Sequence, residues 1–242
     1  MSLCPSITES LVAIGLRDEL VGVTRYCIHP AAELRGVPRV GGTKNPDLAR
    51  IGALSPDLVF VNAEENRRED VEALRERFDV DVSHPCSAEE VPALLRHFGR
   101  RTARESQAEG WAARIEARLA ELSPAERRPF RFAYLIWKAP WMAAAGGTYI
   151  SNLLAVVGGH NVLDGGDPYP TVAEEALAAA DPDLLLLPDE PYRFREPDCA
   201  FWQERLPRAA VRLVSGDDLC WHGVRTLRGL DAVEGLARDL AP

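Results

Sequence analysis

Hydrophobic and polar positions follow two patterns along the chain. Amphipathic stretches such as residues 67–78 carry apolar side chains at helical spacing, and short continuous apolar runs such as LVFVNA and LLLLP lie between such stretches. The amphipathic stretches are typical of helices, and the runs are typical of strands buried on both faces. Because helices that alternate with buried strands indicate parallel sheets, the sequence predicts an α/β fold.

One unit of this pattern occurs twice. LSPDLVFVNAEEN at 54–66 and ADPDLLLLPDEP at 180–191 place a helix end, a Pro-Asp turn, an apolar strand and acidic residues in the same order. Two such series predict two lobes of related, Rossmann-like build with parallel sheets. We assign residues 1–100 to an N-terminal α/β lobe and residues 124–242 to a C-terminal α/β lobe.

The segment between these lobes has the composition of a helix. Residues 100–122 are rich in Ala, Arg and Glu, and Trp111, Ile115 and Leu119 recur on one face. A flexible linker would show Gly, Ser or Pro instead. We therefore predict one long bridging helix over residues 101–123, which joins the two lobes.

Composition and charge narrow the function classes. The net charge of −9 and the pI of about 5.2 argue against nucleic acid as a partner, since phosphate binding needs a basic patch. No stretch approaches the roughly 18 apolar residues of a membrane span. The first residues, MSLCPSITES, lack the features of a signal peptide, which keeps a cytoplasmic location open. Neither a GxSxG, an HExxH nor a phosphate-loop motif occurs, so the sequence does not predict an enzyme.

Four stretches together carry a family resemblance: SLCPSITESLVAIGL, VPRVGGTKNPDLARIGALSPDLVFV, GGTYISNLLAVVGGHNV and VAEEALAAADPDLLLL. Their order and spacing resemble the helical-backbone (class III) substrate-binding proteins of ABC importers, of the cobalamin and iron-siderophore receptor type. The resemblance covers nearly the whole chain. It implies a monomer that binds a metal chelate in a cleft between two lobes, without an intrinsic cofactor, and delivers it to a membrane permease. It also implies a periplasmic or extracytoplasmic location.

Unusual side chains gather where predicted strands end. In open α/β sheets, ligands bind beyond the carboxyl ends of the strands. Tryptophans there would give a flat chelate an aromatic surface, and basic groups would pair with its oxygens. The candidate ligand-binding residues are Arg25, Tyr26, Cys27, His29, Lys44, Glu64, Trp137, Trp141, Trp221, His222 and Arg225. The alternatives are packing between the lobes for the tryptophans, helix capping for Glu64, capping of or ion pairing with the closing helix for Arg225, and a solvated turn position for Lys44.

Two Cys-x-His pairs suggest a possible contact with metal. Cys27 and His29 lie two residues apart, and Cys220 and His222 repeat that spacing. Cys and His are ligands for zinc, cobalt and iron, so a Cys2His2 set is one hypothesis. A second is that His29 or His222 touches a chelated metal axially. The alternative is that the cysteines are small buried hydrophobes, since neither pair has the usual zinc spacing.

These predictions lead to two hypotheses about function. The first is a substrate-binding protein that captures cobalamin, another corrinoid or another metal chelate for ABC-type import. The second is a cytoplasmic metal- or tetrapyrrole-handling protein of the same fold, either a metallochaperone or an enzyme. By the same resemblance, exposed acidic residues dock such proteins to their permease, and Glu69 and Glu196 are the candidates.

Overall fold

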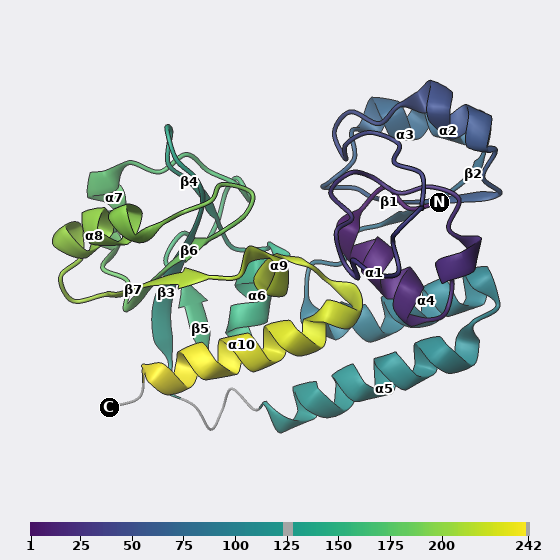
Figure 1. Ribbon diagram of the computed structural model, residues 1–242. Coiled ribbons are helices and arrows are strands. Elements are labelled where there is room, and N and C mark those ends of the chain that lie inside the picture. Colours follow the sequence, from purple (N-terminus) through teal and green to yellow (C-terminus); the bar gives the residue numbers. More distant parts are fainter. Residues whose placement is uncertain (123–127, 241–242) are drawn as a thin grey trace. The chain divides into compact units, whose positions relative to one another are not determined.

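The computed structural model describes residues 1–122 and 128–240, and the chain in it divides into two compact units (Figure 1). Unit 1 consists of Met1–Pro85, Glu90–Ile115 and His222–Arg225. Unit 2 consists of Cys86–Glu89, Glu116–Trp221 and Thr226–Pro242. Within the described residues, no helix combines the length and the apolar character that crossing a membrane requires.

Unit 1 contains a parallel sheet. Strand β1 (Leu58–Asn62) pairs in parallel with β2 (Asp79–Ser83). Isolated parallel bridges continue the sheet from β1, since Ser2 pairs with Phe60 and Val23, and Val23 pairs with Arg39. The apolar run of β1 is buried from Val59 to Val61, as expected for a strand that is covered on both faces.

Helices cover both faces of this sheet (Figure 1). On one face, α2 (Leu48–Leu54) and α3 (Arg68–Arg75) pack Ile51 and Leu74 against Val59 and Val61. On the other face, Phe60 meets Phe98 of α4 (Val91–Thr102) edge to face, with ring centroids 5.2 Å apart. The remaining helical segments of this unit are α1 (Pro5–Ala13), the first half of α5 (Glu105–Glu121) and the 3-10 turns η1 (Arg17–Glu19) and η4 (Gly223–Arg225).

Unit 2 contains a mixed sheet in the order β4-β3-β6-β7, with β5 also pairing with β3. Strands β5 (Gly159–Asn161), β3 (Phe130–Trp137), β6 (Leu184–Pro188) and β7 (Ala210–Val214) are parallel, and β4 (Met142–Ala144) is antiparallel to β3. The five residues of β6 are all buried, which its run of leucines predicts.

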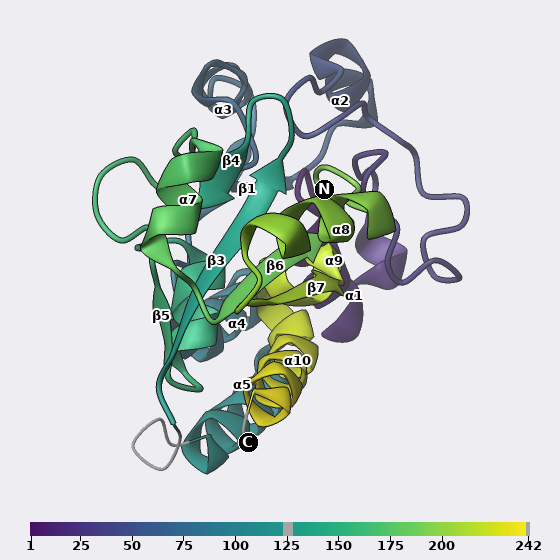
Figure 2. The ribbon, with the colours of Figure 1, turned by 90° about the vertical axis from the view of Figure 1, so that its left-hand side faces the viewer.

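The helices of unit 2 also lie on two sides of its sheet (Figure 2). Those on one side are α7 (Glu174–Ala180) and α8 (Glu196–Arg205), and Trp202 of α8 packs with Leu185 and Leu187. Those on the other side are α6 (Tyr149–Ala155) and α10 (Thr226–Asp239), joined by a hydrogen bond between the hydroxyl groups of Tyr149 and Thr226. The short helix α9 (Gly216–Cys220) follows β7, and η2 (Ala88–Glu90) precedes α4. The predicted α/β class is confirmed.

The repeated sequence unit is a repeated structure. Helix α2 ends at Ser55 with φ of 45°, and α7 ends at Asp181 with φ of 46°, both in the left-handed region. A proline and an aspartate follow each of them, and the strands β1 and β6 then begin at Leu58 and Leu184. The same turn chemistry therefore ends a helix and starts a buried strand in each unit.

The predicted helix over residues 101–123 is wrong at its N-terminal end. Helix α4 continues to Thr102, Ala103 adopts a φ of 52°, and α5 begins only at Glu105. The break between α4 and α5 lets the two helices approach each other closely at Gly99. A Cβ on Gly99 would lie 2.6 Å from the Cβ of Ala108. Helix α5 then runs unbroken through Gly110 to Glu121, with its first part in unit 1 and its last part in unit 2. The predicted boundary at residues 123 and 124 lies outside the described residues.

Candidate functional site

In unit 1, exposed polar and aromatic side chains gather at the carboxyl edge of the parallel sheet. The guanidinium of Arg25 lies 5.0 Å from the centroid of the Tyr26 ring, and Tyr26 is 50% exposed. Lys44 donates a hydrogen bond to the carbonyl oxygen of Glu64, which follows β1. The structure thus brings Arg25 and Tyr26 together at one strand end. Lys44 and Glu64 follow two other strand ends, and the hydrogen bond joins them.

Two asparagines that the sequence analysis missed hold these loops in place. The side-chain oxygen of Asn62 accepts hydrogen bonds from the backbone N–H of Glu64 and Glu65 at 2.9 and 3.1 Å. The side-chain amide of Asn66 donates to the carbonyl oxygens of Leu3 and Thr43. Both asparagines are buried, so this framework is internal to unit 1. An Asn directly after an apolar strand is a signal for such a turn.

Cys27 takes no part in the exposed edge. Its side chain is completely buried, and its sulfur lies 3.0 Å from Oγ1 of Thr8 and 3.1 Å from Oγ1 of Thr24. Burial raises the pKa of this thiol. These positions contradict the prediction that Cys27 contacts a ligand. His29 lies two residues further on and is partly exposed.

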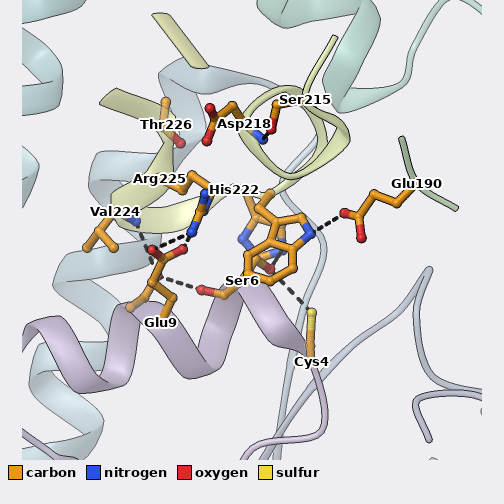
Figure 3. A network of polar contacts seen from close by, with 12 residues as sticks. Cys4, Ser6, Glu9, Glu190, Ser215, Asp218, His222, Val224, Arg225 and Thr226 are labelled. Carbon is orange, nitrogen blue, oxygen red and sulfur yellow. Dashed lines mark hydrogen bonds and ion pairs between the residues drawn. The ribbon is translucent and has the colours of Figure 1, made fainter. Parts of the chain in front are cut away.

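His222 and Arg225 belong to unit 1, which corrects their assignment to the second lobe. Nε2 of His222 lies 3.1 Å from Oγ of Ser6 and 3.3 Å from Nδ2 of Asn62 (Figure 3). Burial lowers the pKa of His222 to about 4, so the imidazole is neutral at pH 7. Arg225 donates two hydrogen bonds to Glu9, at 2.7 and 2.9 Å. Arg225 thus forms a structural ion pair, but with α1 and not with the closing helix that the alternative named.

The cysteine and histidine pairs do not assemble a metal centre. Among residues 1–122 and 128–240, no group of three or more His, Cys, Asp or Glu side chains is placed to hold a metal ion. The sulfur of Cys220 lies 3.3 Å from the hydroxyl oxygen of Tyr134. The hypothesis of a Cys2His2 set therefore finds no support in the described part of the chain.

In unit 2, strand β3 ends at an exposed tryptophan that contacts a partly buried tyrosine. Trp137 is 42% exposed, and its ring meets that of Tyr192 edge to face, with centroids 5.6 Å apart. Tyr192 follows β6, the neighbouring parallel strand. Trp137 was predicted from the sequence and Tyr192 was not. Tyr192 directly follows the PDEP turn, and therefore also lies at a predicted strand end.

Trp141 is embedded in unit 2 instead of being displayed at its edge. Its ring stacks on Phe194 with an interplanar angle of 11° and meets Trp202 edge to face. Its indole N–H donates to Glu174 at 2.9 Å. Lys138 donates to the buried Asp198 at 2.5 Å, although its own side chain is 40% exposed. Trp141 therefore packs within unit 2, whereas the alternative predicted from the sequence was packing between the lobes.

Trp221 is anchored by an acidic residue that the sequence analysis did not select. Its indole N–H donates to Oε1 of Glu190 at 2.6 Å, and Trp221 is 7% exposed. Glu190 follows β6, so this pair lies at the carboxyl edge of the unit 2 sheet. Burial, together with the neighbouring Asp217, raises the pKa of Glu190 to about 8. The signal in the sequence was the acidic pair that ends the LLLLPDE run.

The two acidic docking candidates occupy equivalent local positions. Glu69 lies in the first turn of α3 and Glu196 in the first turn of α8, and both are exposed. Each helix follows a parallel strand of its own unit, β1 for α3 and β6 for α8.

The fold and these edges define a class of protein. A family model described as periplasmic binding protein matches residues 1–196, and the chain belongs to this family. The resemblance noted in the sequence is therefore confirmed.

Relatives within this class carry specific names. The chain is 27% identical over 238 residues to the vitamin B12-binding protein of Vibrio cholerae serotype O1, covering 97% of this chain and 86% of the relative. It is 25% identical over 216 residues to the vitamin B12-binding protein of Pectobacterium atrosepticum, covering 85% of this chain and 76% of the relative.

Solved structures of the same kind match nearly the full length. The periplasmic vitamin B12 binding protein BtuF of Vibrio cholerae matches with a TM-score of 0.85 and 26% identity, covering 99% of this chain and 94% of that chain. The periplasmic heme-binding protein RhuT from Roseiflexus sp. RS-1 matches with a TM-score of 0.83 and 21% identity, covering 99% and 98%. At that identity the second match speaks for the fold alone.

Proposed function

We propose that this protein binds a corrinoid, cobalamin in the first place, and hands it unchanged to an ABC importer. The observation that carries the proposal is the exposed ring of Trp137, which the partly buried Tyr192 supports, at the carboxyl ends of β3 and β6. A corrin is large and nearly planar, and aromatic rings bury such a surface at a small cost in side-chain entropy. The names of the relatives support the same ligand class.

The polar part of the ligand needs hydrogen-bonding groups as well. Cobalamin carries amide side chains and a phosphodiester on the rim of its ring. Arg25, Lys44 and the carboxylate of Glu64 are exposed at the carboxyl edge of unit 1, and Tyr26 adds an aromatic hydroxyl there. Arg and Lys suit the phosphodiester, and Glu64 and Tyr26 suit the amides. We propose these four residues, His29, Trp137 and Trp221 as the ligand-binding set.

Delivery of the ligand requires a partner protein in the membrane that this protein reaches from outside the cytoplasm. We propose an extracytoplasmic location and a permease that recognises Glu69 and Glu196. Both carboxylates are exposed on the first turns of their helices. Exposed charges that pair across an interface guide association more than they add to affinity. Charge reversal at either residue is therefore expected to slow uptake while leaving ligand affinity as it is.

Titration calorimetry with cyanocobalamin tests the ligand assignment. Trp137→Ala should weaken binding by about 1–3 kcal/mol, the loss typical of an aromatic anchor. This equals a roughly 5- to 150-fold higher dissociation constant. Val21→Ala is the matched control, since Val21 is 38% exposed but precedes the strand residue Val23, at the amino edge of the unit 1 sheet.

The outcome that contradicts the proposal is equally concrete. Equal affinity of the wild type and Trp137→Ala would remove Trp137 from the site. Haemin and a ferric siderophore serve as comparison ligands in the same titration. Tighter binding of either one would overturn the corrinoid assignment and leave the binding-protein class intact.

A further inference from the structure

A short turn at the carboxyl edge of the unit 1 sheet is anchored from the inside. The backbone N–H of Cys27 donates to the carbonyl oxygen of Thr24 at 3.2 Å, so that Tyr26 lies in the middle of a four-residue turn. The thiol of Cys27 is buried against the hydroxyl groups of Thr8 and Thr24. The inner side of the turn is therefore fixed, while Tyr26 is exposed.

One guanidinium nitrogen clamps both ends of this turn. Nη1 of Arg39 donates to the carbonyl oxygen of Thr24 at 3.0 Å and to that of Cys27 at 2.7 Å. Arg39 is partly buried, and its backbone forms a parallel bridge with Val23, directly before the turn. Hydrogen bonds from a charged donor are stronger than those between neutral groups. The position of the turn therefore depends on Arg39.

The turn presents two apolar side chains to solvent. Tyr26 and Ile28 are each 50% exposed, and no other large apolar side chain in residues 1–122 and 128–240 is exposed to a greater extent. Cys27 between them is completely buried, so the chain alternates between exposed and buried side chains. The Tyr26 ring also lies close to Gly42, where an added Cβ would be 3.1 Å from Cε2 of the ring. Apolar surface that is already held in place binds a ligand at a small cost in entropy.

We propose that Ile28 is a further ligand-binding residue that contacts the corrin ring beside Tyr26, and that Arg39 is the positioning residue that fixes both side chains. The inference rests on the proposed function and deepens it, because the proposed ligand-binding set includes Tyr26 but neither Ile28 nor Arg39. The faces and methyl groups of a corrin ring are apolar, so they suit Ile28 better than the polar nucleotide of cobalamin does. Arg39 acts through the carbonyl oxygens of the turn.

Titration calorimetry with cyanocobalamin tests the contact of Ile28. Burial of one apolar carbon changes a dissociation constant by about fourfold, and Ile28 has half of its surface left to bury. Ile28→Ala should therefore raise the dissociation constant about five- to tenfold, whereas Ile28→Leu should stay within about twofold of the wild type. Val21→Ala is the matched control and should leave the affinity unchanged, since Val21 is 38% exposed at the amino edge of the same sheet.

Cobinamide separates the ring from the rest of the ligand, because it keeps the corrin ring and lacks the nucleotide with its phosphodiester. Ile28→Ala should weaken the binding of cobinamide by the same factor as that of cyanocobalamin. A loss with cyanocobalamin alone would overturn the contact of Ile28 with the corrin ring. Unchanged affinity for both ligands would overturn any role of Ile28 in binding.

Hydrogen exchange of the ligand-free full-length protein tests the clamp. In Arg39→Met the backbone N–H groups of residues 24–28 should exchange about tenfold faster than in the wild type, because the turn loses its charged donor. Arg50→Met is the control and should leave this exchange unchanged, since Arg50 is exposed on α2. Arg39→Lys should recover part of the protection, because both hydrogen bonds come from one nitrogen and an ammonium group can donate both. Equal exchange in the wild type and Arg39→Met would refute the positioning role.

A comparison of two backgrounds separates positioning from general stability. Arg39→Met alone should weaken cyanocobalamin binding about tenfold, and Arg39→Lys should weaken it less. In a variant that already carries Tyr26→Ala and Ile28→Ala, Arg39→Met should cost less than about twofold, because no apolar side chain is left to position. Equal factors in both backgrounds would show that Arg39 only stabilises unit 1 and would overturn its role. Circular dichroism confirms that each variant is folded at the temperature of titration, and Arg39→Lys provides the comparison if Arg39→Met does not fold.

The inference and the proposed function fail in different ways. Wild-type binding of cyanocobalamin and cobinamide, with no effect of Ile28→Ala or Arg39→Met, overturns the inference and leaves corrinoid binding intact. Absence of binding of both ligands to the wild type overturns the proposed function, and the ligand contact of Ile28 falls with it. The exchange experiment needs no ligand, so it tests the clamp of Arg39 in either case.

Discussion

At the scale of single residues, the ion pair between the buried Arg225 and the largely buried Glu9 has a direct consequence for stability. Arg225 is 5% exposed and reaches Glu9 with two hydrogen bonds. Removal of one member of a buried pair leaves an uncompensated charge, whereas removal of both can be nearly neutral.

Arg225→Met should therefore lower the free energy of unfolding by about 3–5 kcal/mol, measured by urea denaturation. The double variant Glu9→Gln with Arg225→Met should recover a large part of that loss. Arg68→Met is the control, because the pair of Arg68 with Glu72 is exposed and should cost less than about 0.5 kcal/mol. A loss no larger than that of the control would show that the pair does not carry this energy.

The pH dependence of stability follows from Glu190. Its pKa is raised from 4.5 to about 8 in the folded protein, so the folded state holds the proton more tightly than the unfolded chain. The contribution of protonated Glu190 to the free energy of unfolding is fully present below pH 4.5 and is lost as the pH rises through 8. Glu190→Gln should accordingly raise the melting temperature at pH 9.5 relative to the wild type and give no such gain at pH 5. The same gain at both values would refute the assignment.

Sequence reasoning at this scale succeeded where it needed only a strand end. Tyr26, Lys44 and Trp137 follow buried apolar runs, and each is exposed at the carboxyl edge of a sheet. Sequence reasoning failed where the direction of a side chain decides whether that side chain is exposed or buried. The sequence places Cys27 beyond a predicted strand end, but its backbone N–H bonds to the carbonyl oxygen of Thr24 in a turn that aims the thiol into the core. A local pattern contains no information on such partners.

At the scale of elements, composition predicted the long helix and missed its first turn. The run from Arg100 onward is rich in Ala, Arg and Glu, which are strong helix formers, so propensity alone does not mark a break at Ala103. Tertiary packing decided otherwise, since Ala103 takes a left-handed conformation and α5 starts after it. The Pro-Asp turns were predicted in both repeats, because proline and aspartate act locally.

Gly110 lies inside α5 with open space around the position of its missing Cβ. Gly110→Ala should therefore raise the free energy of unfolding by about 0.5–1 kcal/mol, through the better helix propensity of alanine. Gly99→Ala is the contrasting variant, because its Cβ would meet that of Ala108 at 2.6 Å and should destabilise unit 1. Thermal and chemical denaturation of both variants measure the difference. A loss of stability in Gly110→Ala would contradict the described course of α5.

At the scale of the whole molecule, ligand binding should be visible as a gain in stability. A ligand that binds only the folded state at 100 times its dissociation constant adds about 2.7 kcal/mol. Cyanocobalamin should raise the melting temperature accordingly, and riboflavin, an aromatic compound without a corrin ring, should not. With Trp137→Ala the shift at the same cyanocobalamin concentration should be smaller. An equal shift from both compounds would argue against corrinoid recognition.

The sequence predicted lobes made of contiguous stretches, and the structure divides the chain differently. Residues 86–89 fall in unit 2 although they precede α4, and residues 222–225 fall in unit 1 although unit 2 surrounds them in the sequence. Periodicity reveals local structure, whereas membership in a unit depends on which distant segments pack together. Ser6 and Glu9, the partners of His222 and Arg225, lie more than two hundred residues away in the chain.

The short segment His222–Arg225 sets a limit on modular exchange. A chimera that replaces everything after residue 221 with the corresponding part of a relative would carry away the arginine that neutralises Glu9. It would also remove the glycine at φ 85° that fits against Ser10. Recombination between members of the family therefore has to transplant residues 222–225 together with α1. A gene split at residue 221 would produce two fragments, and each fragment would lack residues that complete its own core.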